Sequence, residues 1–216
     1  MQSTAECASR TIWTITSHNP NYRLHILPID VQQTPLTGVA VITPSRLADH
    51  RGFFSESYSI QALASHGITT SFVQDNHTIS MVHGAIHGPQ FQAPPRAQGK
   101  LVRCGRGALF DVAVDIRKGS PTYGQWFGVE LSFENGKQLL VPVGFAHGFV
   151  TRAPETEIIY KCTDYYAQET EGAVAWNDPE VGIDWGLGDM TPVLSDKDAN
   201  APFLADLNSP FTFESV

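Results

Sequence analysis

Ala108-Leu-Phe-Asp-Val-Ala-Val-Asp-Ile-Arg117 is the stretch of the sequence that decides the fold class. Its even-numbered positions, 110–116, are large and apolar, whereas its odd-numbered positions, 111–117, are charged or small. Successive side chains of a strand point to opposite faces, so this alternation predicts a β-strand over residues 108–117.

The neighbouring segments repeat this pattern. Residues 127–133 alternate in the same way, and Asn135-Gly136 follows, a dipeptide that tolerates the positive φ of a tight hairpin. Only residues 60–67 have the pattern of a helix, and it is short. Many short strands separated by glycine and proline turns indicate an all-β sandwich or barrel. The further strands that we expect cover residues 138–141, 148–152 and 157–162, with one more around residues 22–27.

Composition limits the function. The 216 residues carry a formal net charge of −8, which argues against a nucleic-acid partner or an anionic membrane surface. Cys7, Cys104 and Cys162 form no CxxC pair and no disulfide framework, which favours a reducing compartment. We find neither a signal-peptide pattern nor an apolar run long enough to span a membrane, so we expect a cytoplasmic protein.

Several sequence blocks then point to one family. The blocks are Arg51-Gly-Phe-Phe-Ser-Glu56, Phe72-Val-Gln-Asp-Asn-His77, Ala97-Gln-Gly-Lys-Leu-Val-Arg103, Phe110-Asp-Val-Ala-Val-Asp-Ile-Arg117, Pro142-Val-Gly-Phe-Ala-His-Gly-Phe149, Tyr160-Lys-Cys-Thr-Asp-Tyr-Tyr166, Trp176-Asn-Asp-Pro179 and Leu194-Ser-Asp-Lys-Asp198. In this order along the chain they resemble the dTDP-4-dehydrorhamnose 3,5-epimerases, which make the sugar precursor of L-rhamnose and related deoxysugars.

This resemblance implies a cupin-type jelly-roll barrel that forms a homodimer, binds a dTDP-sugar and works without a metal or another cofactor. It divides the chain into an N-terminal extension (residues 1–37), an epimerase-like jelly-roll domain (residues 38–198) and a C-terminal tail (residues 199–216).

The resemblance also implies the site. In the family a histidine held by an aspartate removes a proton beside the substrate's keto group, a lysine stabilises the enolate, and a tyrosine returns a proton. Lys100 matches that lysine, Tyr160 the tyrosine and Asp198 the aspartate. These roles suit the residue types, because a fixed cation stabilises an enolate best in a dry cavity and a phenol is a general acid. Arg51, Glu56, Gln74, Asn76, His147 and Tyr166 match residues that line the nucleotide and sugar pocket.

One segment departs from the family. The family signature reads Arg-Gly-Leu-His-(aromatic)-Gln, whereas this chain has His87-Gly-Pro-Gln-Phe-Gln92. Gln90 therefore occupies the position of the base, and His87 that of a phosphate-binding arginine. A neutral amide does not titrate near neutral pH, so Gln90 cannot abstract the proton. His87 is a candidate for a relocated base, although a polar pocket or surface role would also explain it.

Other interpretations of these residues remain open. His83, His87 and His147 suggest a metal site, but the cupin pattern of His-x-His with a following glutamate is absent, so we expect no metal. Lys100 would otherwise be a surface lysine, and Asp198 a loop carboxylate. We expect Lys100, Tyr160, His147, Arg51 and Gln90 to line one cavity of the barrel.

Three functions are compatible with this sequence. The first is an isomerase of a nucleotide-linked 4-keto-6-deoxysugar whose activity is altered or partial because Gln90 replaces the base. The second is a repurposed cyclase or isomerase of a small-molecule pathway. The third is a non-catalytic binding protein on the same barrel. Fold alone does not separate them.

Overall fold

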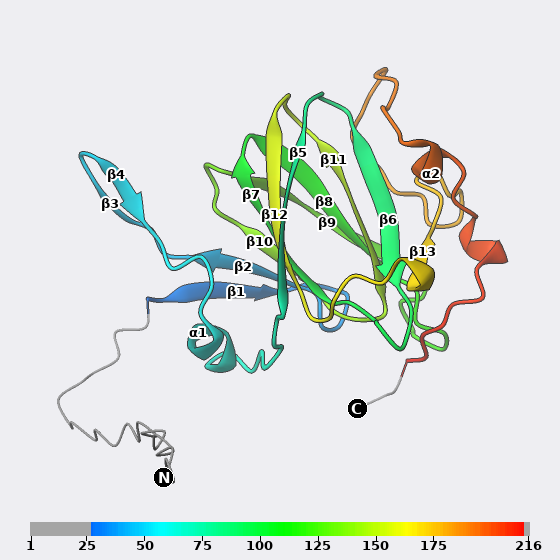
Figure 1. The fold of residues 1–216 in the computed structure, drawn as a ribbon, viewed down its shortest axis with the longest axis horizontal. Helices are drawn as coiled ribbons and strands as arrows, with labels where there is room; N and C mark the ends of the chain where they lie inside the picture. Colours follow the sequence, from blue (N-terminus) through cyan, green and yellow to red (C-terminus); the bar gives the residue numbers. More distant parts are fainter. Residues whose placement is uncertain (1–26, 214–216) are drawn as a thin grey trace, which may run out of the picture.

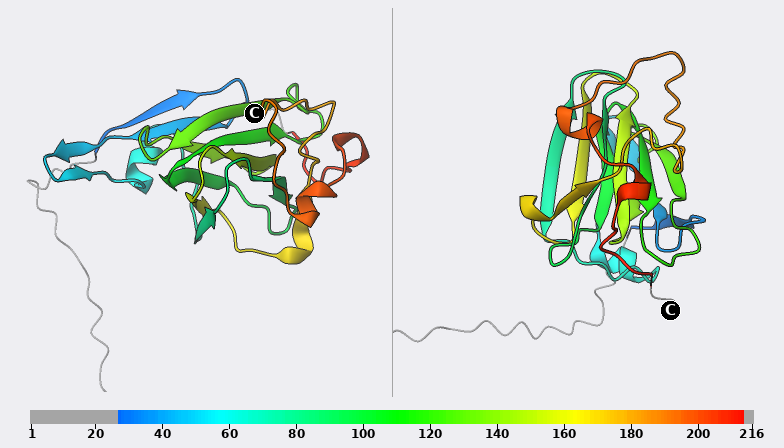
Figure 2. Two further views of the ribbon diagram at one scale, coloured as in Figure 1. Left: turned by 90° about the horizontal axis from the view of Figure 1, so that it is seen from above. Right: turned by 90° about the vertical axis from the view of Figure 1, so that its right-hand side faces the viewer.

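The computed structural model describes residues 27–213, and these form two antiparallel sheets that face each other as a jelly-roll barrel (Figures 1 and 2). The strand orders are β1-β2-β10-β7-β12-β5 in the six-stranded sheet and β13-β6-β11-β8-β9 in the five-stranded sheet. The all-β jelly roll expected from the sequence is confirmed.

The strands of the six-stranded sheet are β1 (Ile29–Gln33), β2 (Ala40–Pro44), β10 (Gln138–Val141), β7 (Lys100–Arg106), β12 (Thr156–Cys162) and β5 (Gln74–Ser80). Those of the five-stranded sheet are β13 (Glu171–Ala173), β6 (Ile86–Gln92), β11 (Phe145–Thr151), β8 (Ala108–Asp115) and β9 (Trp126–Ser132). The remaining elements are the hairpin of β3 (Leu47–Asp49) and β4 (Gly52–Phe54), the helices α1 (Ile60–Ala64) and α2 (Asp196–Ala199), and the 3-10 turns η1 (Gln168–Thr170) and η2 (Leu204–Asp206).

The strand predicted over residues 108–117 is β8, and both of its faces are buried. Leu109 and Ala113 belong to the cluster between the two sheets, while Val112 and Val114 belong to a second cluster on the outer face. The hairpin predicted at Asn135-Gly136 is wrong, although Gly136 has the expected positive φ of 64°. Strand β9 pairs with β8, whereas β10 pairs with β2 and β7, so this turn carries the chain from one sheet to the other.

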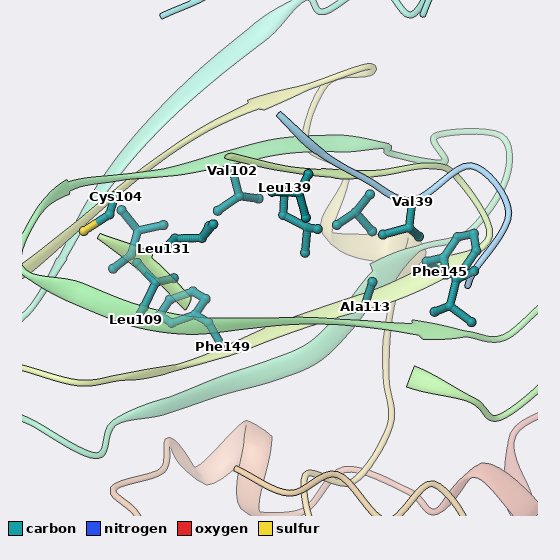
Figure 3. Packing of buried hydrophobic residues seen from close by; sticks show 13 residues of the cluster. Val39, Val102, Cys104, Leu109, Ala113, Leu131, Leu139, Phe145 and Phe149 are labelled. Atoms are coloured by element: carbon teal, nitrogen blue, oxygen red, sulfur yellow. The ribbon is translucent and has the colours of Figure 1, made fainter. Parts of the chain in front are cut away.

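Two apolar clusters hold the five-stranded sheet in place. The first fills the barrel, where Val102 and Leu139 of one sheet face Leu109 and Phe149 of the other (Figure 3). The second lies on the outer face and is covered by the chain after β13. Leu204 and Phe211, from the segment that the sequence sets apart as a tail, are buried in this second cluster.

The six-stranded sheet has a smaller cover. Helix α1 is N-capped by the Ser59 side chain, which accepts from the backbone N–H of Ala62, and Leu63 packs against the outer face. The predicted helix extends to residue 67, but α1 ends at Ala64, and Gly67 adopts a φ of 79° in the turn that follows. Strand β1 covers residues 29–33, whereas the strand expected around residues 22–27 lies almost wholly outside the described residues.

The hairpin of β3 and β4 projects away from the barrel (Figure 1). Leu47, Phe53 and Phe54 are exposed along it. Within residues 27–213, none of the helices has the length and apolar character needed to cross a bilayer.

Candidate active site

A cavity of about 520 Å³ is lined by residues of β5, β6, β7, β12 and β13. Its volume falls in the range of small-molecule sites. The structure brings six of the residues singled out in the sequence to its wall, namely Gln74, Asn76, Gln90, Lys100, Tyr160 and Tyr166.

The wall formed by β6 contains a β-bulge. Gln90 pairs with His147 of β11, but His87 pairs with Phe149, so the interval from 87 to 90 on β6 is matched by the shorter interval from 147 to 149 on β11. His87 and Gln90 therefore lie on the same side of the strand, although a regular strand would place residues three apart on opposite faces. Gly88 adopts a φ of 77°, and a Cβ there would lie 2.7 Å from the His147 carbonyl oxygen.

His87 is held at one end of this wall. Its Nε2 lies 2.8 Å from the Ser80 hydroxyl, and its ring stacks on Phe149 with the centroids 4.6 Å apart. Burial lowers the pKa of the His87 imidazole, and the nearby Asp198 carboxylate opposes that shift. His87 does not belong to the lining of the cavity that contains Lys100.

Gln90 is fixed by Asp198, which is buried in α2. Asp198 Oδ1 accepts from Gln90 Nε2 at 2.7 Å and from the Gly88 N–H at 3.0 Å, while Oδ2 accepts from the Ser195 hydroxyl at 2.7 Å. A carboxylate only accepts, so the Gln90 nitrogen is the donor and its Oε1 is turned away from Asp198. The amide thus makes the bond to Asp198 that the resemblance assigns to the family's histidine.

Lys100 and Tyr160 face each other in the cavity, with the Lys100 Nζ 5.9 Å from the centroid of the Tyr160 ring. Burial lowers the pKa of Lys100, and the acidic groups of Cys162, Asp111 and Glu171 oppose that shift. Burial raises the pKa of Tyr160, which a hydrogen bond with Asn76 opposes, so the phenol keeps its proton at neutral pH. The cavity therefore offers a cation for an oxyanion and a phenol that can donate a proton.

His147 lies behind this wall rather than on it. Its side chain is 7% exposed, and its Nε2 lies 2.7 Å from Asp111 Oδ1. Asp111 is fully buried, and its Oδ2 is the one buried side-chain nitrogen or oxygen of residues 27–213 that lacks a hydrogen-bond partner. The prediction that His147 lines the same cavity as Lys100 is wrong, because the imidazole is turned towards Asp111 inside the barrel.

Arg51 and Glu56 also lie outside the cavity of their own chain. Arg51 stands at the tip of the projecting hairpin, where it is 78% exposed and bonded to Asp49 at 2.6 Å. The Glu56 carboxylate accepts from the backbone N–H of Leu27 at 3.2 Å. The prediction that Arg51 shares a cavity with Lys100 is therefore wrong within a single chain, because the hairpin carries it away from the barrel.

Sequence reasoning missed several residues of the site. Gln92, Gln98 and Glu171 line the cavity, and Glu171 forms an ion pair with Lys197 at 2.6 Å. Lys197 stands inside the block that supplied Asp198, so that block contained the signal for it. Within the part of the chain that the structure describes, no group of three or more His, Cys, Asp or Glu side chains is arranged to hold a metal ion.

Comparison with known proteins gives one family. Residues 33–206 match the family model described as dTDP-4-dehydrorhamnose 3,5-epimerase. The enzyme of that name from Salmonella typhimurium is 50% identical over 175 residues, which cover 81% of this chain and 94% of the relative.

Solved structures agree with this result. A Legionella pneumophila dTDP-6-deoxy-D-glucose-3,5-epimerase in complex with dTDP-4-keto-L-rhamnose matches with a TM-score of 0.82 and 42% identity, covering 87% of this chain and all of that one (100%). ChmJ, a 3′-monoepimerase from Streptomyces bikiniensis in complex with dTDP-quinovose, matches with a TM-score of 0.73 and 34% identity, covering 80% and 88% of the two chains.

Proposed function

We propose that this chain, which belongs to the dTDP-4-dehydrorhamnose 3,5-epimerase family, is an isomerase of a nucleotide-linked 4-keto-6-deoxysugar with altered proton abstraction. One observation carries the proposal: an amide, Gln90, donates to Asp198 the hydrogen bond that would otherwise orient a basic imidazole. General acid–base catalysis contributes about 10²–10⁴-fold, so the exchange of base for amide removes most of the ordinary reaction unless another group accepts the proton.

The rest of the chemistry is retained. Lys100 would stabilise the oxygen of an enolate formed beside the keto group, and Tyr160 would return a proton from its own side of the cavity. Both groups act on an intermediate that forms only after a proton has been removed. The activity of the protein therefore depends on which group removes it.

His87 is our candidate for that group. The bulge in β6 turns it to the same side as Gln90, and Ser80 fixes its ring. Its lowered pKa favours the neutral imidazole, the form that accepts a proton. Because His87 stands away from the position of Gln90, we propose that it reaches one carbon of the sugar and not both. The similarity to a 3′-monoepimerase is consistent with reaction at a single carbon.

We also infer that the protein acts as a homodimer. The hairpin of β3 and β4 exposes Phe53 and Phe54 and carries Arg51 away from its own cavity. A second copy that covered these rings would bury apolar surface and bring Arg51 towards substrate held by the partner. Sedimentation should give a dimer, and Phe54→Glu should weaken it; a monomer at high concentration of the unmodified chain contradicts this assembly.

Solvent-deuterium exchange into dTDP-4-keto-6-deoxyglucose tests the proposed reaction, because each exchanged position reports a proton abstraction. We expect slow exchange at either C3 or C5, and its loss in His87→Asn. Rapid exchange at both carbons by the unmodified protein contradicts the proposal. Exchange at one carbon that persists in His87→Asn assigns the base elsewhere.

A repurposed enzyme is the second candidate, and the bond between His87 and Ser80 favours it. The family signature has a phosphate-binding arginine at the position of His87. His87 instead forms a hydrogen bond with Ser80 of its own barrel, and it carries no permanent charge. Calorimetry with dTDP, UDP and GDP separates the two candidates. Binding of dTDP supports the sugar-nucleotide isomerase, whereas absence of binding by all three favours a different small molecule.

A further inference from the structure

The chain between β12 and β13 crosses from the six-stranded sheet to the five-stranded sheet (Figure 1). Residues 164–167 of this connection, which we call the crossing loop, pass beside the cavity, and Tyr166 lines it. The side chains of Tyr165 and Tyr166 are both exposed. Because the crossing loop forms neither a helix nor a strand, its backbone groups need partners from other parts of the chain.

Gln92 of β6 bonds the crossing loop on both sides of Tyr166. Its side chain is buried, and its Nε2 donates to the carbonyl oxygens of Arg96 at 2.7 Å and Tyr165 at 3.2 Å. Its Oε1 accepts from the backbone N–H of Ala167 at 2.9 Å. A primary amide has two N–H donors, so both donors of Gln92 are used. Gln92 therefore lines the cavity, but its amide binds the protein's own backbone.

Two further amides of the cavity wall hold the same loop. Gln98 Nε2 donates to the carbonyl oxygen of Asp164 at 2.7 Å, and Gln74 Oε1 accepts from the backbone N–H of Tyr166 at 3.0 Å. Each residue of the crossing loop thus has a backbone group bonded to one of three glutamine side chains. Gln92 alone bonds two of these residues, and they are the neighbours of Tyr166.

We propose that Gln92 is a positioning residue, which fixes the backbone around Tyr166 and so holds the tyrosine ring at the edge of the cavity before a ligand arrives. Gln90 stands two residues earlier on β6, so the two side chains point to the same side of the strand. A loop that is already ordered loses little conformational freedom on binding, and this strengthens affinity without taking part in proton transfer.

The consequence for affinity rests on the function proposed above, in which the ligand is a dTDP-linked sugar. An exposed aromatic ring presents an apolar face to a ring-shaped group of such a ligand. The bonds between Gln92 and the loop exist without ligand, so they can be tested separately from the identity of the ligand.

Calorimetry with dTDP and amide hydrogen exchange of the free protein test this role together. Gln92→Met keeps a side chain of similar length and removes all three hydrogen bonds. We expect the Kd for dTDP to rise about tenfold, because the variant must order the crossing loop when it binds. The backbone N–H groups of Tyr166 and Ala167 should also exchange faster with solvent.

Thr156 supplies the matched control. It is fully buried, and its hydroxyl donates to two backbone carbonyl oxygens, those of Ala153 at 2.8 Å and Ala108 at 3.2 Å. It stands at the end of β12 opposite to the crossing loop. Thr156→Val should therefore leave both the dTDP affinity and the hydrogen exchange of the loop unchanged.

If Gln92→Met does not fold, Gln98→Met, which removes only the bond to Asp164, should shift both measurements in the same direction by less. Unchanged dTDP affinity in the folded variant, or equal weakening in Thr156→Val, overturns the role of Gln92. Absence of dTDP binding by the unmodified protein counts against the proposed function alone. The hydrogen exchange of Ala167 then decides: faster exchange in Gln92→Met supports the positioning role, and unchanged exchange overturns it.

Discussion

Asp198 and Asp111 are two buried carboxylates near one cavity, and each lies 2.7 Å from a side-chain nitrogen. Asp198 accepts a hydrogen bond from the Gln90 amide, and both of its carboxylate oxygens have hydrogen-bond donors. Asp111 contacts the His147 imidazole through one oxygen, and its other oxygen has no hydrogen-bond partner. The amide faces the cavity but has no basic nitrogen, whereas the imidazole has one but is shielded from the cavity. A base needs both access and a basic nitrogen, and neither of these two pairs combines them.

Gln90→His would give the exposed pair a titratable nitrogen, and this should have the largest effect. We expect deuterium exchange into dTDP-4-keto-6-deoxyglucose to rise by about 10²–10⁴-fold, the usual contribution of a positioned general base. Exchange followed by proton NMR measures the change.

The control is Gln90→His combined with Asp198→Asn, which keeps the imidazole but changes the group that orients it. A gain that survives intact in this double variant shows that Asp198 does not orient the ring. No gain in a folded Gln90→His protein means that the cavity no longer accepts the sugar, and this favours the repurposed enzyme.

Lys100→Met should have the next largest effect. The substitution removes the cation that faces Tyr160 and leaves a side chain of similar length. Loss of a single oxyanion-stabilising group costs about 10²–10³-fold, so the exchange measured in Gln90→His should fall by that factor. Lys161→Met, which removes a lysine bonded to Asp75 on the exposed edge of the sheet, should change it little. Equal losses in the two variants contradict a specific role for Lys100.

Asp115→Asn tests what a fully partnered buried carboxylate contributes. Burial raises the pKa of Asp115, but hydrogen bonds from Arg117, Ser120 and Thr122 outweigh this and hold it below the ordinary value. A lowered pKa stabilises the folded state above the unfolded pKa, about 3.9, and the contribution is lost as pH falls through the folded pKa. Asp115→Asn should therefore cost about 3 kcal/mol near neutral pH and flatten the loss of stability below about pH 4. Urea unfolding at a series of pH values measures both effects. If the variant loses stability below about pH 4 as steeply as the unmodified protein, Asp115 does not make this contribution.

Asp111→Asn should have the smallest effect on stability. The substitution keeps an oxygen for His147 and replaces a buried charge, whose Oδ2 has no partner, by a neutral amide. We expect the free energy of unfolding to change by less than about 1 kcal/mol, because the lost ionic interaction and the relieved burial of charge oppose each other. A loss as large as that of Asp115→Asn would mean that Asp111 mainly supports the fold.

The sequence predicted the barrel and matched Gln90 and Asp198 to the positions of the family's histidine and aspartate. It did not predict the hydrogen bond that joins them. Strand alternation and the turn at Gly136 are local properties, so the sequence predicted them, whereas the pairing of β9 and β10 with strands of different sheets is not local. The bulge that turns His87 to the side of Gln90 was not, because the two-residue period of a strand predicts the opposite face.

The roles of His147 and Arg51 depend on contacts that the sequence does not display. His147 matched a pocket position in the family, yet its imidazole turns to Asp111. Asp111 is buried because both faces of β8 are covered by apolar clusters, and the alternation along the strand does not reveal this. Arg51 stands in a motif block, but the hairpin that bears it leaves the barrel. Such long-range placement is a property of the folded chain.

The hydrogen bonds that hold Asp198 in place also have a genetic consequence. Its bonds to Gly88 and Ser195 do not involve residue 90, so they persist whatever side chain stands there. A glutamine codon becomes a histidine codon through a single change in its third base. A library of random point mutants therefore contains the imidazole at residue 90 without any second substitution, and selection for epimerase activity would recover that codon ahead of any variant that must rebuild the carboxylate's surroundings.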